Sequence, residues 1–127
     1  MLHIPAEDYE KLRLLASAAA QTTGSARQRI QALRDELDKA VVMPKQSLPS
    51  GVVMLGSAVT VLDLDLDEKE YYTLVLPQHA DIDQQRISVL SPLGTALIGY
   101  REGDEFTWPT PGGQRHLQIV KVVNSAA

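Results

Sequence analysis

Three aspartates at alternate positions are the residues of this chain most suggestive of metal chemistry. Asp63, Asp65 and Asp67 have the spacing with which an EF-hand loop begins to bind Ca²⁺. That loop requires glycine at its sixth position and a bidentate acid at its twelfth, where this chain has Glu68 and Leu74. The alternation is better explained by a strand whose leucines point inward and whose aspartates point to solvent.

Other catalytic and metal-binding patterns are missing from the sequence. His3, His79 and His116 are dispersed, with no pair at helical spacing, whereas zinc requires three or four convergent ligands. The absence of cysteine excludes a disulfide framework, a thiolate zinc site and a cysteine nucleophile. Neither a G-x-S-x-G elbow nor a glycine-rich phosphate loop is present. We therefore expect no catalytic residues, no bound metal, no cofactor and no small-molecule substrate.

The chain has 127 residues and a net charge of −4, which suits a single core and argues weakly against a protein that coats nucleic acid. Residues 1–45 carry a net charge of +1 and residues 46–127 a net charge of −5. Three arginines and no acid lie between Ala20 and Arg34, which is either a solvated helix face or a basic patch for an acidic or phosphate-bearing partner. The chain has no apolar run long enough for a membrane span and no signal-peptide pattern. We expect a cytoplasmic protein without a membrane partner.

Residues 1–43 are predicted to form a short antiparallel helical hairpin, or coiled coil. Pro5 suits a first helical position, and apolar residues then recur at helical spacing. A polar turn at residues 21–25 ends the first helix, and the second helix repeats Ile30, Leu33 and Leu37. Such short helices bury little by themselves, so the hairpin must lean on the rest of the chain.

A linker is predicted at residues 44–51, followed by a domain of strands at residues 52–127. Strands are expected at 52–55, 58–62, 71–76, 87–90, 105–108 and 115–123, with a phase shift in the last, and a short helix at 92–98. The turn-forming residues that specify this fold are Gly99, Gly103, Asp104, Gly112 and Gly113. The order of elements predicts an α+β domain with a mostly antiparallel sheet.

Three ordered stretches of this second part resemble the C-terminal domain of the bacterial Gre transcript cleavage factors. They are residues 55–63, residues 80–99 with the following Glu102-Gly103-Asp104, and Pro111-Gly112-Gly113. The resemblance implies an FKBP-like fold. It also implies that the loop before the short helix, at Leu90, Ser91 and Pro92, docks on RNA polymerase at the rim of its secondary channel. Leu90 stands where the cleavage factors usually have a polar residue.

The N-terminal hairpin departs from the Gre pattern. Gre factors carry a long coiled coil whose acidic tip helps to hold Mg²⁺ in the polymerase active site, whereas this turn has no acid and is flanked by basic residues. Asp35 and Glu36 lie about ten residues beyond the turn, roughly 15 Å along a helix. A short coil with a Gre-like C-terminal domain resembles the Rnk family, the regulators of nucleoside diphosphate kinase. The tip residues are Thr22, Thr23, Gly24, Arg27 and Arg29.

These resemblances imply a non-catalytic transcription regulator that binds RNA polymerase and competes with other secondary-channel factors. It would meet nucleic acid only indirectly, through the transcription complex. Two enzymatic alternatives are a Gre-type cleavage and elongation factor and a prolyl isomerase, whose pocket would need converging aromatic residues. A third alternative is a regulator that acts on another protein, such as nucleoside diphosphate kinase.

Overall fold

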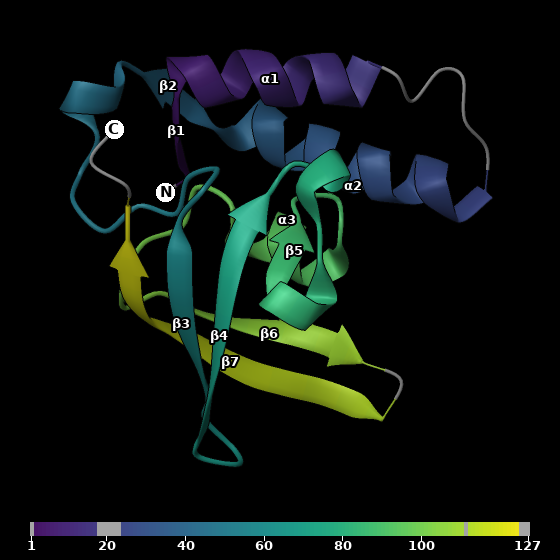
Figure 1. Ribbon diagram of the computed structural model, residues 1–127, viewed down its shortest axis with the longest axis vertical. Helices are drawn as coiled ribbons and strands as arrows, with labels where there is room; N and C mark the ends of the chain where they lie inside the picture. Colours follow the sequence, from purple (N-terminus) through teal and green to yellow (C-terminus); the bar gives the residue numbers. More distant parts are fainter. Residues whose placement is uncertain (1, 18–23, 111, 125–127) are drawn as a thin grey trace.

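The computed structural model describes residues 2–17, 24–110 and 112–124, which form a helical hairpin and a five-stranded sheet. The hairpin consists of α1 (Ala6–Ser17) and α2 (Gly24–Lys39). The two helices lie across one end of the sheet domain, with α2 next to α3 (Pro92–Leu97) (Figure 1). The predicted α+β class and the mostly antiparallel sheet are confirmed.

The ends of the hairpin differ from the prediction, because they are strands rather than helix. β1 (His3–Pro5) pairs in parallel with β2 (Val41–Met43), and Pro5 ends the strand just before α1 begins at Ala6. Proline fits this position because its fixed φ suits both the strand and the helix start. The backbone N–H of His3 also donates to the carbonyl of Gly99 at 3.0 Å, so the pair anchors the hairpin to the second part of the chain.

The hairpin and the sheet domain share one hydrophobic core. Leu12 and Ala16 of α1 and Ile30, Leu33 and Leu37 of α2 are buried at the predicted helical spacing. They belong to the same cluster as Val59, Leu74, Leu97, Leu117 and Ile119 of the sheet domain. The expectation that short helices need the rest of the chain is therefore confirmed, since neither face would be covered alone.

The sheet has the strand order β5-β4-β3-β7-β6. Its members are β3 (Ala58–Asp63), β4 (Glu68–Val75), β5 (Arg86–Ser88), β6 (Glu105–Thr110) and β7 (Gly113–Val123). Only the β4–β5 pairing within it is parallel. The pairing of β3 with β7 shifts register between Thr60 and Val61, a bulge that explains the predicted phase shift in the last strand.

One predicted strand is not formed. Residues 52–55 contribute only an isolated bridge, between Val52 and Arg101, although Val52 and Val53 are fully buried. Short 3-10 turns lie at Lys45–Ser47, Pro77–His79 and Ile82–Gln84, the first of them in the predicted linker. The apolar run at residues 52–55 is explained by burial alone. A buried extended segment has the same apolar composition as a strand, so the sequence pattern does not distinguish them.

Candidate functional site

The turn that leads from β5 into α3 is the best-defined candidate site, and it is held by its own serines. The Ser88 hydroxyl accepts from the backbone N–H of Leu90 at 2.9 Å, and the Ser91 hydroxyl donates to the Ser88 carbonyl at 2.7 Å. Ser91 also accepts from the N–H of Gly94 at 3.0 Å, as expected of a helix N-cap with proline behind it. The turn is thus a preformed surface element rather than a loose loop.

The three residues predicted for docking lie together on this turn. Pro92 is exposed, while Leu90 and Ser91 are half-buried. A hollow of about 290 Å³ opens beside them, between the turn and α2. Its lining consists of Arg29, Ile30, Pro77, Ser88, Leu90 and Ser91. The structure therefore brings one residue of the predicted basic tip, Arg29, next to two residues of the predicted docking loop.

The remaining tip residues are placed only in part. Thr22 and Thr23 lie outside the described residues, and Gly24 begins α2 with a φ of +69°. Arg27 is exposed on α2, but it does not line the hollow that Arg29 reaches. Side chains two positions apart on a helix point in nearly opposite directions, so Arg27 and Arg29 lie on different surfaces of α2.

The acids of α2 are directed toward the sheet domain or toward their own helix. Glu36 accepts from the Tyr100 hydroxyl at 3.4 Å and lies 3.8 Å from the Lys39 ammonium group. Asp35 accepts from the Gln31 side chain at 3.0 Å. Burial, followed by the nearby Glu36 charge, raises the pKa of Tyr100. Glu36 therefore links the hairpin to the sheet domain, whereas Asp35 bonds only within α2.

Sequence reasoning missed an ionic cluster at the far end of the sheet. Asp63 is 2% exposed, and its carboxylate accepts from the Arg115 guanidinium at 3.0 Å and from the backbone N–H groups of Asp65 and Leu66, both at 3.0 Å. Arg115 also pairs with Glu70, which accepts in turn from the Tyr72 hydroxyl at 2.5 Å. The N–H of Leu66, with smaller help from Arg115, lowers the pKa of Asp63, and burial with the Glu70 bond raises that of Tyr72 to about 12.

The expected orientation of the Asp63–Asp67 alternation is therefore wrong for Asp63 and for the two leucines, although Asp65 and Asp67 are exposed as predicted. The first aspartate is buried, while Leu64 and Leu66 are 39% and 64% exposed in the turn between β3 and β4. The strand ends at Asp63, so the alternation runs through a turn in which period two no longer decides which side chain is inside. No local pattern announces the cluster, because Arg115 lies on β7, far along the chain.

Three of the predicted turn glycines have the expected positive φ, Gly112 does not, and one further glycine carries a packing constraint. Gly99, Gly103 and Gly113 have φ values of +83°, +93° and +131°, and the Asp104 carboxylate accepts from the N–H of Arg101 at 2.8 Å. A Cβ at Gly112 would meet no atom within 4 Å. A Cβ at Gly94, within α3, would lie 2.1 Å from the Ser88 carbonyl oxygen. Gly94 therefore lets α3 approach the turn between β5 and α3 closely.

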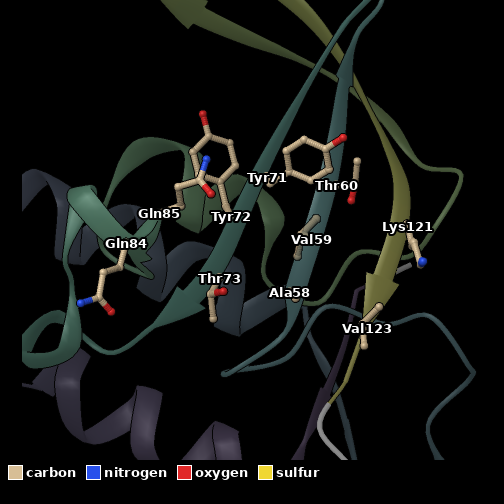
Figure 2. A pocket seen from close by; sticks show the side chains of 10 residues that line it. All are labelled: Ala58, Val59, Thr60, Tyr71, Tyr72, Thr73, Gln84, Gln85, Lys121 and Val123. Atoms are coloured by element: carbon tan, nitrogen blue, oxygen red, sulfur yellow. The ribbon is translucent and has the colours of Figure 1, made fainter.

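The aromatic residues do not converge as a prolyl isomerase pocket would require. A hollow of about 200 Å³ lies on the sheet. Figure 2 shows that two of its lining residues, Tyr71 and Tyr72, project to opposite sides of β4. Phe106 lines a different hollow with Leu64 and His116, and the Tyr100 hydroxyl meets Glu36. The side chain of Trp108 lies outside the described residues. Among the aromatics that are described, Tyr71 and Tyr72 share one hollow, which neither Phe106 nor Tyr100 lines.

The described residues contain neither a metal-binding cluster nor a membrane-spanning helix. Across the described ranges, histidine, aspartate and glutamate nowhere gather in a group of three or more that could hold a metal ion. Within the same part of the chain, no helix is long and apolar enough to cross a membrane.

Comparison with known proteins identifies relatives of the whole arrangement. The family model "Transcription elongation factor, GreA/GreB, C-term" matches residues 48–124. A solved structure titled as a prokaryotic transcription elongation factor GreA/GreB from Nitrosomonas europaea has 34% identity and a TM-score of 0.80, covering 98% of this chain and 100% of the other. GreA factor homolog 1 of Thermus thermophilus is 25% identical with a TM-score of 0.53, covering 97% and 99% of the two chains.

Curated relatives are named transcription elongation factor GreA. The protein from Desulfotalea psychrophila is 37% identical over 83% of this chain, and the one from Hyphomonas neptunium is 40% identical over 75%. The chain spans only 65% and 60% of the length of these two relatives. These names contradict the prediction that the protein has no catalytic role. Gre factors act in transcript cleavage, and the relatives are named as Gre factors.

The family model covers more than half of the chain, and the matched region contains β3 to β7, α3 and the docking turn. The Nitrosomonas structure extends the likeness through the hairpin to nearly the full chain. On this evidence, the chain belongs to the GreA/GreB family of transcription elongation factors.

Proposed function

We propose that this protein is a Gre-type transcription elongation factor that binds RNA polymerase at its secondary channel. The Leu90–Pro92 turn is the docking element, and the hairpin extends from it toward the transcribing complex. The observation that carries the proposal is the rigid conformation of that turn, which three side-chain hydrogen bonds stabilise at the surface. The turn lies within the region that the family model matches. The protein meets nucleic acid only through the transcription complex, in the cytoplasm.

The hairpin gives the proposal its second part. Its helices have only 12 and 16 described residues, a length that supports the resemblance to the Rnk family. Contacts with β1, Leu55 and Tyr100 fix its direction relative to the docking turn. A factor with this shape acts on the elongation complex by placing its helical hairpin at the channel entrance.

The test is binding to core RNA polymerase, with a Gre cleavage factor as competitor. We expect saturable binding that the competitor displaces, and faster transcript cleavage or release in stalled elongation complexes. Pro92→Ala, together with Leu90→Glu, should weaken binding, while the exposed Leu14→Ala, on α1, is the matched control. Absence of binding at micromolar concentrations, or binding that the competitor leaves unchanged, would refute the proposal.

A further inference from the structure

The hollow between α2 and the docking turn presents hydrogen-bond donors that the protein does not use. Arg29 forms neither an ion pair nor a hydrogen bond with any residue that the structure describes. The Ser88 hydroxyl accepts from Leu90, but within the described part of the chain its own proton goes to no acceptor. By contrast, Ser91 already donates its hydroxyl proton to the Ser88 carbonyl, so it has no donor left for a ligand.

A ligand for this hollow must therefore bring acceptors. A carboxylate has acceptor atoms only, and a guanidinium binds it with two parallel N–H groups. No acid lies between Ala20 and Arg34 in the sequence, so α2 offers no nearby carboxylate of its own around Arg29. The positive charge of Arg29 is therefore available to a carboxylate of a partner.

The walls of the hollow decide between a protein carboxylate and a nucleic-acid phosphate. Ile30, Pro77 and Leu90 contribute apolar surface beside the donors. An aspartate or glutamate on a folded protein brings apolar neighbours that such walls can cover, whereas a phosphate backbone does not. The net charge of −5 over residues 46–127 also repels nucleic acid from the domain that forms most of the hollow.

We propose that this hollow receives an acidic side chain of the polymerase, bound by Arg29 of α2 and by the Ser88 hydroxyl. The inference rests on the proposed function and adds to it that docking is shared: the hairpin contributes to the polymerase contact together with the C-terminal domain. The close approach of α2 to the turn is then part of the binding surface, because separating the two elements would separate the two donors.

The test compares Arg29→Glu with Arg27→Glu in the full-length protein. Both arginines are exposed on α2, and the substitutions change the net charge equally, but only Arg29 lines the hollow. We expect Arg29→Glu to weaken polymerase binding about ten-fold or more, since charge pairs at interfaces are costly to reverse. Arg27→Glu should weaken binding much less, because Arg27 does not line the hollow. Equal losses, or no loss for either variant, would overturn the inference.

A second experiment identifies the ligand chemistry. Arg29→Lys places an amine at the hollow, and a carbodiimide joins an amine only to a carboxylate in contact with it. We expect a crosslink to one polymerase subunit, absent with Arg27→Lys. A variant that binds polymerase without any crosslink would count against a carboxylate. So would an Arg29→Glu variant that loses affinity for a single-stranded RNA oligonucleotide while keeping its affinity for polymerase.

The two proposals fail in different ways. If the wild-type protein binds polymerase and is displaced by a Gre factor, but Arg29→Glu behaves as the wild type does, then the shared contact is wrong and the proposed function stands. If the wild-type protein does not bind polymerase, both are wrong. Thermal denaturation of each variant shows that a loss of affinity is not a loss of folding.

Discussion

The carboxylate of Asp8 accepts a hydrogen bond of 3.0 Å from the backbone N–H of Leu55, 47 residues further along the chain. This bond joins the first turn of α1 to the segment that enters the sheet domain. The Tyr100 hydroxyl, which donates to Glu36, makes a corresponding link from the sheet domain to α2. The direction of the hairpin is therefore set by polar contacts as well as by the shared core.

The Asp8 link predicts a difference between two substitutions. Asp8→Ala should lower the free energy of unfolding by about 1 kcal/mol, because the N–H of Leu55 loses its acceptor. Asp8→Asn should cost less, since the amide oxygen can still accept. Urea denaturation of the full chain measures both. Equal losses would show that the hydrogen bond does not hold the joint.

The same residue predicts a pH effect. Burial raises the pKa of Asp8 above its ordinary value of 3.8, so the folded state binds the proton more tightly than the unfolded state does. Ionisation of Asp8 therefore costs stability as the pH rises from about 3.8 through the raised pKa. Asp8→Asn should remove that decline, which urea midpoints measured across this interval would reveal. A decline that persists unchanged in the variant would contradict the assignment.

Asp63 predicts the opposite dependence. Its pKa is lowered, chiefly by the N–H of Leu66, so its ionised form stabilises the folded state fully above the ordinary value of 3.8. This contribution is lost as the pH falls through the lowered folded-state pKa. Asp63→Asn should therefore be less stable than the wild type at neutral pH and should flatten the acid loss. Asp65→Asn, which changes an exposed carboxylate of the same turn, is the matched control for the substitution itself.

Two glycine substitutions separate close packing from backbone conformation. Gly94→Ala should destabilise by about 3 kcal/mol, because its Cβ would overlap the Ser88 carbonyl, which belongs to the docking turn's hydrogen bonds. In Gly103→Ala the new Cβ would meet no atom within 4 Å. The variant should lose only the roughly 1 to 2 kcal/mol of backbone strain that a φ of +93° imposes on alanine. Thermal denaturation shows which of the two variants is less stable. A Gly103→Ala variant as damaged as Gly94→Ala would contradict the packing argument.

The helix cap predicts how Ser91 contributes to docking. Ser91→Ala should lower stability by about 1 kcal/mol, because the N–H of Gly94 loses its partner. Ser91→Asp restores a capping oxygen and should recover most of that loss. If Ser91 acts only by shaping the turn, polymerase affinity should follow stability in both variants. Affinity that remains low in Ser91→Asp despite recovered stability would indicate a direct contact at Ser91.

Local chemistry explains the parts of the fold that were predictable. The Ser91-Pro92 pair starts α3, and Gly99 follows its end with a positive φ, because capping and turn preferences depend only on near neighbours. Apolar periodicity placed the buried face of α2 for the same reason. The strands His3–Pro5 and Val41–Met43 were not predicted, because three-residue segments are too short to show a period and each forms only by pairing with the other.

The sequence by itself determined the element types, most turns and the likeness to the Gre C-terminal domain, since these reside in short ordered stretches. Only the tertiary structure decided which distant side chains meet. It placed Arg29 of α2 beside Ser88 and Leu90, and Asp63 against Arg115. The physical reason is that contacts between remote segments arise from closure of a common core, in which the position of each partner depends on the packing of all the elements between them.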